Sequence, residues 1–259
     1  MLKITPLPAL KDNYIWIIHI NASEVVVVDP GVSQVVCDWL KKEGLLPTAV
    51  LVTHRHWDHT DGVNALQDQF SIPVYGPNSP AVPCVTHPVN ENSILDLIPR
   101  YNIKIIETPG HTLDHISFLI EQKLANSSSP KQLFCGDTLF SAGCGRIFDG
   151  TAELLFQSLQ KLKNLPDDTL VYCTHEYTAA NIQFALAVEP NNEALHCYST
   201  KTREHEITLP TTIKVEMEVN PFLRTREPSV ELAVNRHKNH RATSESETFV
   251  TLRAWKDQF

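Results

Sequence analysis

One short segment of the chain contains four potential metal ligands. Residues 53–59 read Thr-His-Arg-His-Trp-Asp-His, so His54, His56, Asp58 and His59 all fall within this segment. The apolar run 49–52 that precedes it predicts a buried strand, and active sites of α/β proteins gather where such strands end. Imidazole and carboxylate groups suit zinc, iron or manganese, whereas paired thiolates would indicate a structural zinc. The segment therefore predicts a catalytic metal site.

Further candidate ligands follow other predicted strands, namely His111, Asp137 and His175. His54 and His56 are two residues apart, so on an extended chain their imidazoles project to the same side and can share one ion. Asp58 and His59 continue toward the next helix and can turn to a second ion. Two adjacent ions are expected if the three remaining ligands converge on this segment.

The elements that position these residues alternate between strands and helices. Strands are expected at 14–20, 24–29, 50–53, 74–75, 103–107, 116–120, 133–135 and 170–173, and helices at 33–43, 61–70 and 152–162. Gly44 should end the first helix. Strands 116–120 and 133–135 should pair, and the polar, Ser-rich segment 121–131 between them predicts a flexible hairpin loop.

The character of the chain changes near residue 174. Helices are expected at 179–188, 192–202, 229–238 and 247–256. Pro228 at a first helical position and a capping box from Ser244 to Glu247 mark two of the starts. We therefore expect a mixed α/β (α+β) fold with a metal-binding catalytic domain at 1–174 and a helical domain at 175–259.

Composition narrows the classes of protein. The 259 residues carry a formal net charge of −8 and no long basic run, which argues against nucleic acid as a partner. No run of about 18 apolar residues and no signal-peptide pattern are present, so no membrane partner and a cytoplasmic location are expected. The six cysteines are scattered, as in a reducing compartment. We expect a monomer.

These motifs resemble the metallo-β-lactamase superfamily and, more closely, its glyoxalase II (hydroxyacylglutathione hydrolase) branch, over nearly the whole chain. The resemblance implies a four-layer αβ/βα sandwich followed by a helical domain that binds glutathione. It implies two divalent ions per chain, with Zn²⁺ expected before Fe or Mn. One ion would take His54, His56 and His111, the other would take Asp58, His59 and His175, and Asp137 would bridge them.

The substrate side of the resemblance rests on three further motifs. Residues 140–146, Phe-Ser-Ala-Gly-Cys-Gly-Arg, are similar to the family's AGCG segment, whose following basic residue, here Arg146, helps hold glutathione. Tyr177 is similar to a tyrosine that contacts its peptide part. Arg253 and Lys256 lie three residues apart, on one helical face. Their C-terminal segment resembles the one whose Arg and Lys bind the glycine carboxylate of glutathione in the family.

Two residues depart from the family pattern. Phe148 stands where some members carry a second substrate-contacting tyrosine, and Asp61 stands where the superfamily often has glycine. Neither position is a predicted ligand.

The resemblance implies hydrolysis of S-(2-hydroxyacyl)glutathione, typically S-D-lactoylglutathione, to glutathione and D-lactate, the second step of methylglyoxal detoxification. A metal-bound hydroxide would attack the thioester carbonyl. Asp58 and Asp137 are the expected catalytic residues, since Asp58 would orient the hydroxide and Asp137 would fix the spacing of the ions.

The residues fit other functions less well than this one. Lactone, β-lactam or other thioester hydrolysis would use the same ligands without the residues of the glutathione site. A di-iron flavoprotein tends to have Glu in place of His56, a nuclease needs a basic tract, and a non-catalytic module would have lost ligands. His115 is expected to be structural. Asp29 either hydrogen-bonds a ligand histidine or simply ends its strand.

Overall fold

The computed structural model describes residues 2–124, 129–239 and 241–259, and the chain divides into two compact units. Unit 1 comprises Met1–Glu107 and Asp114–Gly136, and unit 2 comprises Thr108–Leu113 and Asp137–Phe259. The division follows packing, because the hairpin, helix and strand that follow residue 137 join the helices of the C-terminal part.

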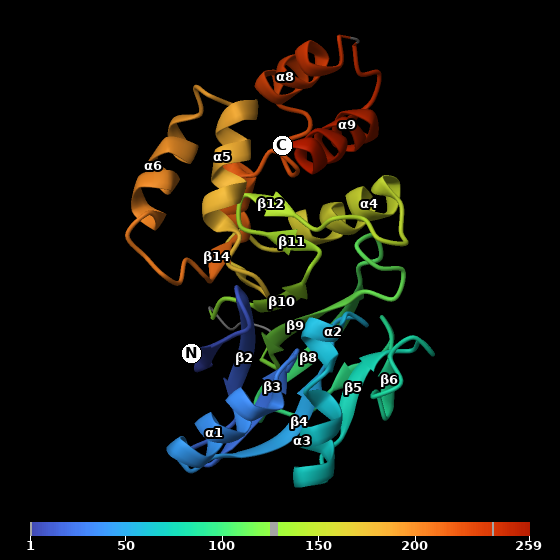
Figure 1. Ribbon diagram of the computed structural model, residues 1–259, viewed down its shortest axis with the longest axis vertical. Helices are drawn as coiled ribbons and strands as arrows, with labels where there is room; N and C mark the ends of the chain where they lie inside the picture. Colours follow the sequence, from blue (N-terminus) through green and yellow to red (C-terminus); the bar gives the residue numbers. More distant parts are fainter. Residues whose placement is uncertain (1, 125–128, 240) are drawn as a thin grey trace. The chain divides into compact units, whose positions relative to one another are not determined.

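A six-stranded sheet forms the larger part of unit 1 (Figure 1). Its strands lie in the order β1 (Ile4–Ala9), β2 (Asn13–His19), β3 (Glu24–Val28), β4 (Leu46–Leu51), β5 (Val74–Pro77) and β6 (His87–Val89). The first three strands are antiparallel and the last four are parallel. The carboxyl ends of β3 and β4 are therefore neighbours, which brings Asp29 close to the segment that follows β4.

Helices α1 (Ser33–Glu43) and α3 (Val63–Phe70) cover one face of this sheet (Figure 1). Val36 and Leu40 of α1 share one buried cluster with Leu66 of α3 and with strand residues such as Val27 and Val50. As expected, α1 ends at Gly44, whose φ of 67° is a left-handed conformation that glycine adopts without strain.

The helix expected at 61–70 corresponds to α3, which starts two residues later at Val63, and a helix that was not expected precedes it. A short helix, α2 (Trp57–Thr60), starts directly after His56, so Asp58 and His59 lie on a helical turn and not on an extended loop. The break falls at Gly62, where a Cβ atom would come 2.4 Å from the Pro30 carbonyl oxygen. Only glycine permits that close approach, and the Gly62 N–H donates to the same carbonyl at 3.0 Å.

Unit 1 also contains four antiparallel strands, β7 (Ile94–Leu95), β8 (Tyr101–Glu107), β9 (Ile116–Gln122) and β10 (Gln132–Gly136). The expected pairing of β9 with β10 is confirmed, since Phe118 lies opposite Phe134 and Leu119 opposite Leu133. Strand β9 extends into the segment expected to be a loop, and residues 125–128 of that segment lie outside the described residues.

Unit 2 contains the helices of the C-terminal part, and all four helices expected there are confirmed. Its helices are α4 (Ala152–Lys163), α5 (Thr178–Val188), α6 (Glu193–Thr202), α7 (Ile213–Val219), α8 (Pro228–Lys238) and α9 (Glu245–Gln258), and its strands are β11 (Leu139–Phe140), β12 (Gly143–Cys144), β13 (Leu170–Cys173) and β14 (Thr211–Thr212). Helix α7 and the two-residue strands were not expected. Stacked, fully buried rings of Phe184 and Phe222 contribute to its core.

The start of α9 confirms half of the expected capping box. The Ser244 hydroxyl accepts a hydrogen bond from the Glu247 N–H at 3.1 Å. The Glu247 carboxylate bonds instead to the N–H and hydroxyl of Thr243, both at 2.8 Å. In the described part of the chain, no helix has the length and apolarity needed to cross a bilayer.

Candidate functional site

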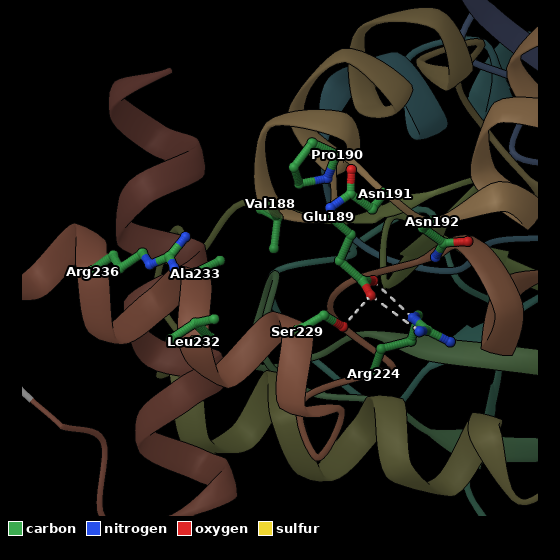
Figure 2. A pocket seen from close by; sticks show the side chains of 10 residues that line it. All are labelled: Val188, Glu189, Pro190, Asn191, Asn192, Arg224, Ser229, Leu232, Ala233 and Arg236. Carbon is green, nitrogen blue, oxygen red and sulfur yellow. Dashed lines mark hydrogen bonds and ion pairs between the residues drawn. The ribbon is translucent and has the colours of Figure 1, made fainter.

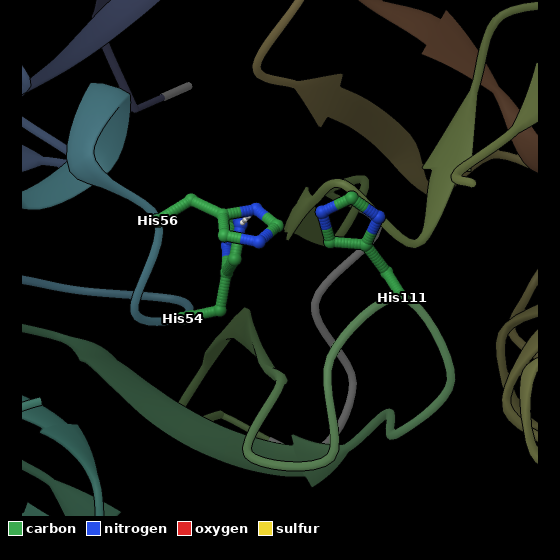
Figure 3. A group of neighbouring side chains, drawn as sticks. All are labelled: His54, His56 and His111. Carbon is green, nitrogen blue, oxygen red and sulfur yellow. Dashed lines mark hydrogen bonds between the residues drawn. The ribbon is translucent and has the colours of Figure 1, made fainter. Parts of the chain in front are cut away.

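The first two predicted ligands lie side by side just beyond β4. His54 Nε2 and His56 Nδ1 are 3.0 Å apart, and Figure 3 shows the two rings side by side. Two imidazole nitrogens bound to one ion at about 2.0–2.1 Å are separated by about 2.9–3.4 Å when the angle between them is roughly 90–110°. The pair therefore fits one ion without rearrangement.

Asp29 fixes the protonation of two predicted ligands. Its Oδ2 accepts the hydroxyl proton of Thr53 at 2.8 Å and lies 3.0 Å from His59 Nδ1, while its Oδ1 accepts the Thr53 N–H at 2.8 Å. Because the Thr53 hydroxyl donates to Asp29, it can only accept from His54 Nδ1, 3.1 Å away. Both histidines then carry their proton on Nδ1, which leaves Nε2 free of a proton for a metal.

Both alternatives considered for Asp29 are therefore found together. It hydrogen-bonds a predicted ligand, and with a φ of 51° it also forms the left-handed turn that ends β3. The carboxylate is almost completely buried, with 1% of its side chain exposed.

Asp58 lies next to His59, with 3.7 Å between Asp58 Oδ2 and His59 Nε2. The side chain of Asn13 donates to the same Oδ2 at 3.0 Å. Sequence reasoning missed Asn13, because a lone asparagine before an apolar strand has no ligand spacing to identify it. Its bond orients one carboxylate oxygen, so Asn13 supports the direction of the Asp58 side chain.

The unit 2 ligands are arranged around one carboxylate oxygen. Asp137 Oδ2 lies 3.4 Å from His111 Nε2 and 3.4 Å from His175 Nε2, and all three side chains are buried. His111 Nδ1 donates to the main-chain carbonyl of Arg146 at 2.7 Å, so its Nε2 also carries no proton in the neutral ring. The three side chains of unit 2 that are predicted ligands therefore lie within reach of one another.

His115 has the structural place expected of it. It is buried, stacks on His54 with 4.8 Å between ring centroids, and lies under Gly136. A Cβ atom at Gly136 would come 2.7 Å from His115 Nε2, and the φ of 48° at this glycine is left-handed. Glycine is thus required directly before Asp137.

Among the predicted substrate residues, Arg146 and Tyr177 are accessible. The Arg146 side chain is 70% exposed, and its Nε lies 3.7 Å from Asp257. Tyr177 is 36% exposed and stacks on His175 with 4.7 Å between ring centroids. Phe148, the departure from the family pattern, is exposed and places its ring edge against His111.

Arg253 lies deeper than the prediction required. Only 4% of its side chain is exposed, and Nη1 donates to the carbonyls of Cys144 and Gly145 at 3.0 and 3.3 Å. Nη2 donates to Asp257 at 3.0 Å. In this arrangement Arg253 holds the segment that leads into Arg146.

Lys256 lies one turn of α9 further on. Its Nζ is 3.3 Å from the Ala180 carbonyl oxygen and 5.1 Å from the ring centroid of Phe184. Burial, reinforced by the positive charge of Arg253, lowers the pKa of Lys256 to about 8. An anion beside this ammonium would restore its charge.

A separate pocket of about 350 Å³ in unit 2 is lined by residues of α8, the end of α5, the turn between α5 and α6, and Arg224, none of them a predicted site residue (Figure 2). Its buried Glu189 accepts from Arg224 at 2.7 and 3.0 Å and from the Ser229 hydroxyl at 2.6 Å. Because these polar groups satisfy one another, they fix the start of α8 to the α5–α6 turn, and they show no feature that selects a ligand.

Known proteins resemble the chain along its whole length. Residues 10–175 match the metallo-beta-lactamase superfamily, and residues 176–259 match the hydroxyacylglutathione hydrolase C-terminus. A hydroxyacylglutathione hydrolase of Aliivibrio salmonicida is 48% identical over 100% of both chains, and that of Vibrio cholerae is 47% identical over the same share. The chain belongs to the hydroxyacylglutathione hydrolase family.

Solved structures agree with the metallo-β-lactamase fold. The BLEG-1 B3 metallo-beta-lactamase is 27% identical with a TM-score of 0.61 and covers 86% of this chain and 99% of its own. ETHE1 from Myxococcus xanthus is 23% identical with a TM-score of 0.65 over 98% of this chain and 91% of its own, which shows the fold alone. The expected fold, a metallo-β-lactamase fold followed by a helical C-terminal region, is confirmed.

Proposed function

We propose that the chain hydrolyses the thioester bond of S-(2-hydroxyacyl)glutathione, typically S-D-lactoylglutathione, and releases glutathione and D-lactate. The proposal rests on full-length identity of 42–48% to proteins named hydroxyacylglutathione hydrolase. The observation within the chain that best supports it is the pairing of a complete ligand set with an exposed Arg146 directly after the family's glycine-rich segment.

The metal part of the proposal is that the chain holds two divalent ions, with Zn²⁺ favoured over Fe or Mn. One ion would take His54, His56 and His111, and the other would take Asp58, His59 and His175. Asp137 would bridge the ions. The donor chemistry fits, because three of the histidines carry a held Nδ1 and a proton-free Nε2, the state that metal binding requires.

The substrate part of the proposal assigns the glutathione contacts to unit 2. Arg146 would bind a carboxylate through its planar guanidinium, Tyr177 would contact the peptide part, and Lys256 would pair with the glycine carboxylate. Arg253 would contribute its charge and the position of the loop before Arg146. Residues 1–174 and 175–259 would act as catalytic and substrate-binding domains, and the two family matches change at the same place, between 175 and 176.

In the reaction, bound divalent ions would supply a low pKa for water and polarise the thioester carbonyl. Asp58 would hold the attacking water through the carboxylate that Asn13 orients. Asp137 would fix the separation of the two ligand sets. Because glutathione leaves as a thiolate, which is a good leaving group, none of the described side chains is needed as a dedicated general acid.

We propose a cytoplasmic monomer that uses neither nucleic acid nor membrane as a partner. The six cysteines form no disulfide, which agrees with a reducing compartment. The formal net charge of −8 disfavours polyanions.

The proposal is tested by measuring metal content per chain and then, on the same sample, hydrolysis of S-D-lactoylglutathione, a thioester without glutathione, and a lactone. We expect two ions per chain and a strong preference for the glutathione thioester. Arg146→Ala should raise KM about tenfold, because a hydrogen bond to a charged group contributes at least about 1.5 kcal/mol. Arg236→Ala should leave KM unchanged. If the protein holds two ions but prefers the lactone, the proposed substrate is refuted, while the proposed metal-dependent hydrolase activity stands.

A further inference from the structure

The hairpin β11–β12, which precedes Arg146, has a turn that needs external support. Ala142 in this turn has a φ of 55°, a left-handed conformation that residues with a Cβ atom avoid. The hairpin has only two residues in each strand, so its own pairing contributes little. Groups outside the hairpin must therefore hold this conformation.

Glu216, on the unexpected helix α7, provides one of these groups. Its Oε2 accepts the N–H of Ala142 at 2.8 Å and a proton of Asn220 Nδ2 at 2.9 Å, and its Oε1 accepts the Thr211 hydroxyl at 2.9 Å. The residue has no exposed surface, and burial raises its pKa to about 7 against the effect of these donors. A buried carboxylate is costly, so its direct bond to the strained residue indicates a specific role.

Two asparagines bind the other main-chain groups of the hairpin. Asn220 Nδ2 lies 3.2 Å from the Phe140 carbonyl oxygen and 2.9 Å from that of Gly143. Asn181 Nδ2, on α5, donates to the Ser141 carbonyl at 3.0 Å. We call Asn181, Glu216 and Asn220 the hairpin clamp.

The end of the clamped hairpin leads directly to functional groups. The Gly145 N–H donates to the Thr138 carbonyl at 3.2 Å, and the next residue is Arg146. The Arg146 carbonyl accepts from His111 Nδ1 at 2.7 Å, and its side chain is exposed. A shift of the hairpin would therefore move a substrate contact and the acceptor that orients a predicted ligand.

We propose that the hairpin clamp is a positioning set for the hydrolase, which fixes the β11–β12 turn so that Arg146 meets the glutathione portion of the substrate. The three residues touch neither substrate nor ion and act through the main chain of residues 140–146. The inference rests on the proposed role of Arg146 and adds the residues that make that role possible.

The geometry supplies a matched pair of variants at Glu216. In Glu216→Gln, the amide oxygen can still accept from Ala142 and Asn220, while the amide NH₂ can donate to the Thr211 hydroxyl, which also accepts. In Glu216→Ala, the Ala142 N–H loses its acceptor. Glu189→Ala is the control, because Glu189 is an equally buried glutamate of unit 2 whose bonds go to Arg224 and Ser229 and not to the hairpin.

The experiment combines amide hydrogen exchange of residues 139–146 with kinetics on S-D-lactoylglutathione, using metal-loaded full-length protein. In Glu216→Ala we expect faster exchange at Ala142 and a KM raised about tenfold, with kcat within roughly threefold, since the lost contact is a remote binding interaction. Glu216→Gln should restore both values. In an Arg146→Ala background, Glu216→Ala should raise KM no further.

Several outcomes would overturn the inference. If Glu189→Ala raises KM as much as Glu216→Ala does, the hairpin clamp contributes only to the general stability of the fold. Unchanged exchange in folded Glu216→Ala would show that the clamp does not hold the turn. An unchanged KM in Arg146→Ala, with faster exchange in Glu216→Ala, would refute the assignment of Arg146 and with it the link to substrate. If Glu216→Ala does not fold, Asn181→Ala removes a single bond to the hairpin and should change exchange and KM in the same directions.

Discussion

Replacing Asp29 with asparagine should weaken metal binding although Asp29 is not a predicted ligand. The carboxylate accepts three hydrogen bonds, two from Thr53 and one from His59. An amide has one accepting oxygen, so its NH₂ must face either the Thr53 N–H or the His59 Nδ1 proton. In the second orientation His59 must move its proton to Nε2, the nitrogen proposed to bind the ion.

The size of the effect follows from these contacts. Loss of a carboxylate that orients a ligand histidine lowers metal affinity about 10- to 100-fold, which corresponds to about 1.4–2.7 kcal/mol. We therefore expect a 10- to 100-fold rise in the Kd for the metal.

The assay is competition of the protein with a chromophoric zinc chelator at fixed pH, with folding checked by circular dichroism. Asp38→Asn is the control, since Asp38 is an exposed carboxylate on α1 that accepts a hydrogen bond from the Gln34 side chain. A folded Asp29→Asn protein whose Kd lies within about twofold of that of Asp38→Asn would refute the argument, since that factor is well below the expected loss.

Three further predictions concern unit 2. Because the pKa of Glu216 is raised from 4.5 to about 7 in the folded state, the folded protein binds this proton more tightly between those values, and the free energy of unfolding should fall by about 3 kcal/mol as pH rises through that window. Urea titrations of wild type and Glu216→Gln across the window measure this, and parallel curves would contradict it. Lys256 loses its charge as pH rises through about 8, so KM should rise above pH 8 in wild type and stay lower in Lys256→Arg; equal KM profiles would exclude Lys256 as a carboxylate contact. Ser244→Ala removes the cap of α9 and should destabilise the protein by about 1 kcal/mol, seen as a lower Tm, whereas an unchanged Tm would show that the Thr243–Glu247 bonds suffice.

Elements with a strong apolar pattern could be predicted from the sequence, whereas β1, which has two prolines among its six residues, could not. Helix α1 has an apolar face and a terminal glycine, and its bounds are those expected. Strand β4 starts four residues before its expected start, because parallel pairing with β3 recruits Leu46 and Pro47, which carry no strand signal of their own. Helix α7 and the two-residue strands are set by tertiary bonds, which no local pattern reveals.

In the candidate site, too, a local pattern identifies some residues, and only the fold identifies the others. The spacing of His54, His56 and Asp58 indicates metal chemistry by itself. The groups that orient such ligands, Asn13 and the main-chain carbonyl of Arg146, act across 45 and 35 residues of sequence, so only the fold identifies them. The burial of Arg253 could likewise not be predicted, because the sequence does not distinguish an exposed from a buried charged residue on a terminal helix.

The main chain and the side chain of Arg146 have different roles. The carbonyl that accepts from His111 is present whatever amino acid stands there, while the side chain alone points to solvent. Substitution at this position can therefore change what the protein binds without disturbing the orientation of a ligand histidine. In evolution or in protein engineering, residue 146 could therefore be replaced so that the protein binds a different thiol carrier of the acyl group. The orientation of His111, a predicted metal ligand, would stay the same.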